Sequence, residues 1–286
     1  MISDITLGQF FPGVSILHRL DPRTKILAAV FYIASIFVAD SPISFILLLG
    51  ATLWLIALSR IALSTVLRGI KPIIVILIFT AIINVLFTKG EGEPLVAFWI
   101  IQIHFDGIIR AVFMALRVIL LIMGTSVLLS YTTSPIALTD GLEALLSPLK
   151  RLKVPVHVFA MMMSIALRFI PTLVEETEKI MNAQKSRGAD FESGGLVKRA
   201  RALIPILIPL FVSAFTSAEE LATAMECRCF RGDKNRTKLV KLTLIKNDYI
   251  MLSMLAVLLG TVIALTVIPI PTGALGGVLD VLFYSI

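Results

Sequence analysis

Five long apolar stretches limit what this chain can fold into, because roughly 20 mostly apolar residues in a row are enough to cross a bilayer as a helix. The stretches lie at about 26–39, 42–58, 70–87, 108–130 and 249–268. The chain is 57% hydrophobic and 16% charged, whereas soluble domains are about 45–50% apolar and about 25% charged. The sequence therefore predicts an all-α integral membrane protein with about five transmembrane helices.

The basic residues predict on which side of the membrane each connecting segment lies. No Lys or Arg lies between the first two stretches or after Lys246, whereas the segment 131–247 holds 17 Lys and Arg against 11 Asp and Glu. Because cytoplasmic loops carry the excess of Lys and Arg, we expect the N-terminus and 131–247 in the cytoplasm and the C-terminus outside. The predicted divisions are a bundle of four spans at 1–130, a cytoplasmic helical region at 131–247, and a transmembrane helix and tail at 248–286.

The cytoplasmic region is predicted to contain three helices. Ser134-Pro135 is typical of a helix start, and the short helix that follows is amphipathic. Its apolar stripe comprises Leu138, Leu142, Leu145 and Leu146. Two much longer helices are predicted, one beginning at about 154 and ending near Ser186, and one from about 196 to about 228. Because proline removes a helical hydrogen bond, we expect kinks or breaks at the internal prolines. These are Pro171, Pro205 and Pro209.

The two long helices end in similar sequences, 41 residues apart. The first end reads Glu178-x-Ile180-x-x-Ala183-x-x-Ser186-Arg187-Gly188, and the second reads Glu219-x-Leu221-x-x-Ala224-x-x-Cys227-Arg228-Cys229. One interpretation is local, since arginine at a helix C-terminus complements the helix dipole by about 0.3–1 kcal/mol. The other is functional: small flanking residues let a partner backbone approach, and the guanidinium offers five donors to it. The repetition favours two docking sites for two similar partners.

Chemistry on substrates or metals has little support in the sequence. Cys227 and Cys229 are two soft ligands, whereas a closed zinc site takes four, and the histidines lie elsewhere at His18, His104 and His157. The sequence has no G-x-x-x-x-G-K-[ST] phosphate-binding loop. We therefore expect no metal, no cofactor and no catalytic residue.

Two other classes of protein, a membrane enzyme and a self-sufficient carrier, fit the sequence less well. A membrane enzyme would need clustered acids or histidines, and helical spacing splits the acidic run at 175–178 across different faces. A self-sufficient carrier would be expected to show inverted repeats with broken helices. The only repeat in this chain is the one in the cytoplasmic segment.

Four long blocks of the sequence resemble one transporter family. They are HRLDPRTK at 18–25, TTSPIALTDGLEALLSPLK at 132–150, VPVHVFAMMMSIALRFIPTLVEETEKIMNAQKSRGADF at 154–191, and LIPLFVSAFTSAEELATAMECRCFRG at 207–232. They closely resemble the T component (EcfT family, related to CbiQ), which is the transmembrane coupling subunit of energy-coupling factor transporters. The resemblance covers nearly the whole chain and is greatest to the shared, vitamin-type modules. A T component of a dedicated cobalt or nickel importer is the alternative.

The resemblance implies partners and docking residues. Such subunits join two ABC-type ATPases, which bind the ATP, to a small substrate-binding S component in a bacterial or archaeal cell membrane. Two X-Arg-X motifs at the ends of the coupling helices seat in the ATPases. Here they would be Ser186-Arg187-Gly188 and Cys227-Arg228-Cys229. Relatives commonly carry Ala and Gly where this chain has the two cysteines. The chain itself would transmit motion as a lever between the ATPases and the S component.

Further residues are candidates for contact with the S component or for structural roles. An adaptable apolar surface suits several partners, although the same side chains would equally serve to pack the protein's own helices. The candidates are Leu138, Leu142, Leu145, Met161, Met162 and Met163. Arg168 is expected to form ion pairs with acids one or two turns along its helix, and Glu219 is the counterpart of Glu178 in the repeat. Those acids are Glu175, Glu176 and Glu178.

The fourth stretch contains two arginines, Arg110 and Arg117. An arginine within a membrane span suggests a functional role. Arg110 is close enough to one end to reach the outer surface. The five stretches contain no acid, so the partner of Arg117 must be a residue at a stretch end, a backbone carbonyl or another chain.

Overall fold

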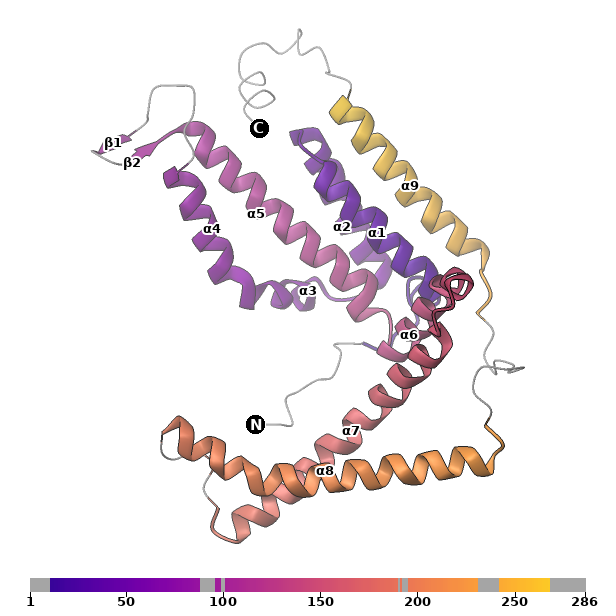
Figure 1. The fold of residues 1–286 in the computed structure, drawn as a ribbon. Helices are drawn as coiled ribbons and strands as arrows, with labels where there is room; N and C mark the ends of the chain where they lie inside the picture. Colours follow the sequence, from indigo (N-terminus) through magenta and orange to yellow (C-terminus); the bar gives the residue numbers. More distant parts are fainter. Residues whose placement is uncertain are drawn as a thin grey trace. The chain divides into compact units, whose positions relative to one another are not determined.

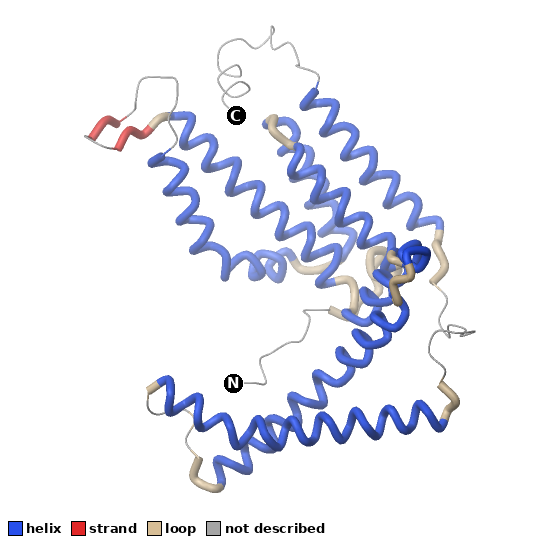
Figure 2. The backbone as a smooth tube through the Cα atoms, viewed as in Figure 1, coloured by secondary structure: helices blue, strands red, loops and turns tan. Residues whose placement is uncertain are grey.

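The computed structural model describes residues 11–87, 96–98, 101–189, 191, 195–230 and 242–267, and these are mostly helical (Figures 1 and 2). Two three-residue strands, β1 (Val96–Phe98) and β2 (Ile101–Ile103), form an antiparallel hairpin. The helices before the hairpin are α1 (Pro22–Val38), α2 (Pro42–Ser59), α3 (Leu63–Ile70) and α4 (Ile74–Phe87), with the 3₁₀ turn η1 (Lys71–Ile73) between the last two. The elements after it are α5 (Phe105–Thr125), the π-helix η2 (Ser126–Tyr131), α6 (Pro135–Leu145), the 3₁₀ helix η3 (Ser147–Leu152), α7 (Val156–Ser186), α8 (Leu196–Cys227) and α9 (Lys246–Val267).

Six helical segments of the described chain are long and apolar enough to cross a membrane, judged by length and composition. Four of them, at 42–59, 63–87, 107–131 and 246–267, coincide with predicted spans. The remaining predicted span, the first at about 26–39, lies in α1, which has 17 residues. The other two segments lie in α7 and α8, the helices predicted to be cytoplasmic. The all-α membrane fold is confirmed, and the cytoplasmic position of α7 and α8 stays a prediction.

Contacts divide the chain into two compact units. One contains residues 8–141 and 242–286, so the last helix belongs with the N-terminal helices. The other contains 142–241 together with 1–7. The predicted division at 130 and 247 concerns position relative to the membrane rather than contacts, and it stays a prediction.

Local signals set the ends of the first two helices. Asp21 caps α1, because its side chain accepts a hydrogen bond from the Arg23 backbone N–H at 2.9 Å, and Pro22 occupies the first helical position. Ser41 caps α2 in the same way, with Pro42 following. Proline is favoured there because its missing N–H would have had no helical partner. Because Ser41 caps α2 directly, the link between α1 and α2 is only three residues long.

Tyr32 holds three helices of the larger unit together at its core. Its side chain is fully buried, and its hydroxyl donates to the Leu120 carbonyl of α5 at 2.9 Å and lies 2.6 Å from the Thr52 hydroxyl of α2. Gly124 of α5 leaves the space for the ring, since a Cβ there would lie 2.1 Å from it. A buried hydroxyl must find hydrogen-bond partners, so Tyr32 fixes how α1, α2 and α5 are packed.

A buried carboxylate joins the first helix of this unit to the last. Asp248 is 2% exposed and accepts hydrogen bonds from the backbone N–H groups of Asp21 at 2.8 Å and Ile245 at 2.7 Å. Lys25 lies close by and donates to the Thr132 carbonyl at 2.7 Å. Burial lowers the pKa of Lys25 from 10.5 to about 8, and the Asp248 and Asp21 carboxylates limit that fall. These contacts give the charged residues at the start of α1 a structural role.

The smaller unit is built on α7 and α8, which pack against each other. Pro171 lies inside α7, and Pro205 and Pro209 lie inside α8, yet both helices continue past them. Of the two expected outcomes, a kink or a break, the break does not occur, because a helix of more than 30 residues loses only one hydrogen bond at each proline. A kink is still expected at such positions, and α8 changes direction along its length in Figure 1.

Candidate functional site

The end of α7 is a complete Schellman motif with Arg187 at its cap position. The Gly188 N–H donates to the Lys185 carbonyl at 2.9 Å, and the Ala189 N–H donates to the Gln184 carbonyl at 3.0 Å. This pattern requires a left-handed residue directly after the cap, and Gly188 has φ +86°. The motif therefore satisfies the last carbonyls of α7 with backbone groups and leaves the guanidinium of Arg187 for other contacts.

The end of α8 repeats this geometry bond for bond. Arg228 is at the cap, the Cys229 N–H donates to the Glu226 carbonyl at 2.8 Å, and the Phe230 N–H donates to the Met225 carbonyl at 3.1 Å. The left-handed position is occupied by Cys229, at φ +58°. A residue with a Cβ is disfavoured in this conformation. The sequence repeat is thus a structural repeat, with one strained residue in its second copy.

All six residues of the two motifs are exposed, namely Ser186, Arg187, Gly188, Cys227, Arg228 and Cys229. Arg187 and Arg228 form no ion pair with any residue that the structure describes. An isolated helix end gains little by exposing an arginine in this way, whereas a protein partner can use all of its donors. The geometry is that of two presented cations.

A shallow groove of about 470 Å³ runs along the last turns of α8, beside the second motif. It is lined by Thr216, Glu219, Glu220, Thr223, Ala224 and Cys227. Glu219 and Glu220 are exposed there, so the groove is acidic while the helix tip is basic. Glu219, which the sequence singles out through the repeat, therefore lies on the surface that leads to Arg228.

The methionine cluster on α7 divides into two groups. Met161 lines a cavity of about 190 Å³ with Arg168 of α7 and Leu221 of α8, so it faces the neighbouring helix. Met162 and Met163 are 54% and 40% exposed. On α6, Leu142 is 41% exposed and Leu138 and Leu145 are half-buried. Met161 therefore packs between the helices, whereas Met162, Met163 and Leu142 are exposed.

The expected ion pairs of Arg168 are not formed within the described part of the chain. Arg168 makes no salt bridge with Glu175, Glu176 or Glu178, and the pair on this helix is Lys179 with Glu176, at 3.9 Å. Seven residues, or about two helical turns, separate Arg168 from Glu175, the nearest of these acids, whereas helical ion pairs are three or four residues apart. The exposed Arg168 side chain lines the cavity with Met161 instead.

The structure supplies the partners of Arg117. Its guanidinium donates to the Ala39 carbonyl and lies 3.2 Å from the Asp40 carboxylate, both in the short link between α1 and α2. It also lies over the Phe45 ring at 5.5 Å. A stretch end and a backbone carbonyl are the partners that the sequence allows, and both are used. Because Asp40 is the one acid in that link, its position was the available signal.

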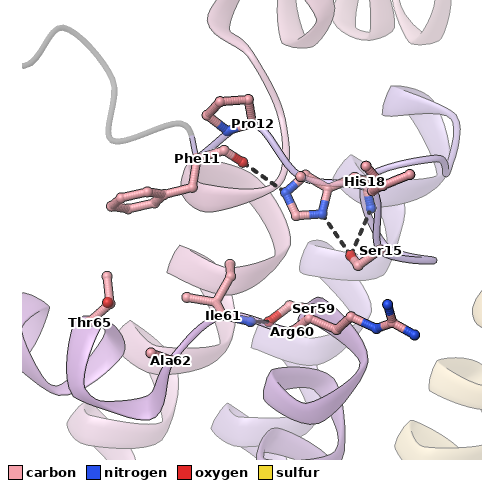
Figure 3. Close-up of a pocket in the computed structure, with 11 residues that line it drawn as sticks. Phe11, Pro12, Ser15, His18, Ser59, Arg60, Ile61, Ala62 and Thr65 are labelled. Carbon is pink, nitrogen blue, oxygen red and sulfur yellow. Dashed lines mark hydrogen bonds between the residues drawn. The ribbon is translucent and has the colours of Figure 1, made fainter.

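A hollow of about 460 Å³ lies near the start of the described chain (Figure 3). His18 forms part of its wall, with Nε2 2.9 Å from the Phe11 carbonyl and Nδ1 2.6 Å from the Ser15 hydroxyl. Arg60, which ends α2 in a left-handed conformation, lines it from the other side. These hydrogen bonds hold the segment before α1 in place, so His18 has a structural role.

Across the described ranges, no three His, Cys, Asp or Glu residues lie close enough together to hold a metal ion. Cys227 and Cys229 are free and exposed.

Comparison with known proteins gives consistent results. The family model CbiQ, described as cobalt transport protein, matches residues 13–239. Several similar relatives are each named energy-coupling factor transporter transmembrane protein EcfT. The one from Acidaminococcus fermentans is 52% identical over 87% of this chain and 91% of its own length. The one from Clostridium kluyveri is 50% identical over 87% and 92%. The one from Bacillus subtilis is 46% identical over 85% and 91%.

Proposed function

The chain belongs to the EcfT family of energy-coupling factor transporter transmembrane proteins, and we propose on that premise that its two arginine-capped helix ends dock two ATPase subunits. The names of the relatives favour this kind of transporter over a dedicated cobalt or nickel importer. The chain is thus the transmembrane component of an energy-coupling factor transporter. Its docking residues, partners and orientation are the proposal.

One observation carries the docking proposal: the two helix ends share the same hydrogen-bond pattern, and each has an exposed arginine at its cap. Selection for helix termination alone does not require an exposed arginine at both caps, because backbone groups already satisfy the last carbonyls. Two copies of one presented guanidinium fit two related partners. A groove in each partner that offers a carboxylate or backbone carbonyls would take up its donors.

The ATPases would supply the energy, and this chain would transmit the motion. The sequence contains no phosphate-binding loop of the Walker type, which supports a non-catalytic role with ATP bound by the partner subunits. α7 and α8, with 31 and 32 residues, are about 45 Å long at 1.5 Å per residue. Displacing their tips would displace whatever packs along them.

The second partner is a small membrane S component that binds a vitamin or another micronutrient. We place its contacts on the exposed candidates Met162, Met163 and Leu142, because flexible thioethers accommodate several partner surfaces. Met161 is assigned to packing between α7 and α8. The N-terminus and 131–247 would lie in the cytoplasm, where the ATPases are, and the C-terminus outside.

The test is co-purification of ATPases with tagged chain from native membranes. Arg187→Ala with Arg228→Ala is expected to abolish ATPase attachment and transport while membrane insertion is retained. The matched control is Lys179→Ala with Lys185→Ala, which removes two exposed cations from α7 and should leave attachment unchanged. Full ATPase binding by the double arginine variant would refute the docking assignment.

A further inference from the structure

Two hollows of the larger unit meet at Arg60, where α2 ends. The first is the hollow of about 460 Å³ shown in Figure 3, and the second, of about 340 Å³, is lined in part by Trp54. Three residues line both hollows, namely Val14, Ser15 and Arg60. Figure 3 shows the Arg60 side chain extending beneath Ser15 and away from Thr65. Arg60 therefore lies where the two hollows join.

The two hollows differ in chemistry. The first contains free hydrogen-bonding groups: the Thr65 hydroxyl, which bonds to no other residue that the structure describes, and the start of α3, which no side chain caps. The second is mostly apolar, with Ile16, Trp54 and Leu58 in its wall. Among the described residues, no Asp or Glu lines either hollow. A ligand that fills both would have an anionic head and an apolar tail.

Arg60 is held in a conformation that its own helix does not require. Its side chain is exposed and forms no ion pair with any residue that the structure describes. Its backbone lies in the left-handed region at φ +56°, where a side chain is disfavoured and glycine is preferred. An unfavourable conformation that is kept at a charged residue points to a function of its side chain.

The opposite wall of the first hollow is fixed by the hydrogen bonds of His18. Both ring nitrogens of His18 are used, by the Phe11 carbonyl and the Ser15 hydroxyl. Gly13 leaves the space for this ring, since a Cβ there would lie 2.9 Å from it. The imidazole therefore builds the wall, and Arg60 is the cation that this part of the described chain offers to a ligand.

We infer that the two hollows bind one anionic phospholipid, with its phosphate on the Arg60 guanidinium and an acyl chain along Ile16, Trp54 and Leu58. Arg60 directly follows the predicted span 42–58, where lipid phosphates lie. Trp54 is about 9 Å deeper along α2, at 1.5 Å per residue, which is the level of the upper acyl chains. Tryptophan is enriched at this interface, and basic pockets beside membrane spans bind anionic headgroups.

The charges select the kind of headgroup. A zwitterionic lipid brings an ammonium group, and neither hollow has a described acid to receive it. Phosphatidylglycerol has one net negative charge and two hydroxyls, which can bond to the Thr65 hydroxyl and to the free N–H groups at the start of α3. The inference concerns the larger unit alone and does not depend on the docking proposed for Arg187 and Arg228.

The test measures which lipid lies beside Trp54. The full chain with Trp99→Phe keeps Trp54 as its one tryptophan and is reconstituted into mixtures of phosphatidylcholine and phosphatidylglycerol. One lipid of each mixture is brominated at mid-chain, so quenching of Trp54 across the mixtures gives the relative binding constant of the two lipids. We expect phosphatidylglycerol to be preferred about fivefold, as one cation at a membrane surface provides.

Three variants separate the proposed contact from general surface charge and from folding. Arg60→Gln should bring the relative constant to about one. Arg68→Gln is the matched control, because Arg68 is an exposed cation of α3 that lines neither hollow, and it should keep the preference of the parent. Arg60→Gly suits φ +56°, so it should be at least as stable as the parent in detergent and still lose the preference.

Several results would overturn the inference. Equal constants for the two lipids in the parent, or an unchanged preference in both Arg60 variants, would remove the anionic lipid from this site. An equal loss with Arg68→Gln would assign the preference to general surface charge. Lack of quenching by either lipid would mean that protein covers the hollow. Displacement of brominated phosphatidylglycerol by excess glycerol phosphate would make the ligand a soluble anion.

Discussion

Cys229 is the residue whose replacement tests the docking geometry most directly. It occupies the left-handed position of the second Schellman motif at φ +58°, where the first motif has Gly188 at φ +86°. A side chain in this conformation costs about 1–2 kcal/mol, while glycine costs about 0.4–1 kcal/mol in extra freedom of the unfolded chain. The difference predicts that Cys229→Gly stabilises the end of α8 by about 1 kcal/mol.

The consequence can be read from two amide hydrogens. The N–H groups of Cys229 and Phe230 form the bonds that close the motif, to the carbonyls of Glu226 and Met225. Local opening exposes these amides to exchange. A gain of about 1 kcal/mol should therefore slow their exchange about fivefold. Hydrogen exchange followed by mass spectrometry, on peptides from the end of α8, measures this.

Two control variants separate backbone strain from loss of the thiol. Cys229→Ser removes the thiol and keeps a Cβ, so exchange should stay as in the parent. Cys227→Gly lies in the last helical turn, where glycine costs about 1 kcal/mol, and exchange should become faster. If Cys229→Gly leaves exchange unchanged or speeds it, the left-handed strain assigned to Cys229 is wrong.

Three further changes test the packing of the larger unit, at Gly124, Asp248 and Lys25. Gly124→Ala should lower the free energy of unfolding in detergent by about 1–3 kcal/mol, since a Cβ there meets the Tyr32 ring. Gly50→Ala should leave it unchanged, because a Cβ there has nothing within 4 Å. Equal effects of the two changes would contradict this reasoning. Asp248→Ala should cost about 3 kcal/mol or more, because it leaves two buried N–H groups and Lys25 without that carboxylate; a stability equal to that of the parent would show that the link between α1 and α9 is dispensable. Lys25 precedes the first predicted span and has its folded pKa lowered to about 8 from 10.5, so the unfolded chain holds the extra proton between those values. Stability should therefore rise with pH across that window, by about 3 kcal/mol at most, and Lys25→Met should remove the rise in unfolding curves recorded at several pH values.

The sequence alone determined the elements whose causes are local. The length of the apolar stretches predicted the spans that lie in α2, α4, α5 and α9. The cap Ser134-Pro135 and the repeat around Arg187 and Arg228 predicted where helices begin and end. Such features depend on neighbours within a few residues, which a sequence shows directly.

Only the tertiary structure decided which distant groups meet. The pairing of Arg117 with Asp40 spans 77 residues, and that of Asp248 with Asp21 spans 227. Asp40 is the one acid in the link between α1 and α2, but nothing local shows that this link meets Arg117 or that Asp248 lies near Lys25. The same holds for Met161, which faces α8, and Met162, which is exposed, although the two are adjacent. Partner choice depends on how whole helices pack, because each buried polar or apolar group is stabilised only by the neighbours that packing brings to it.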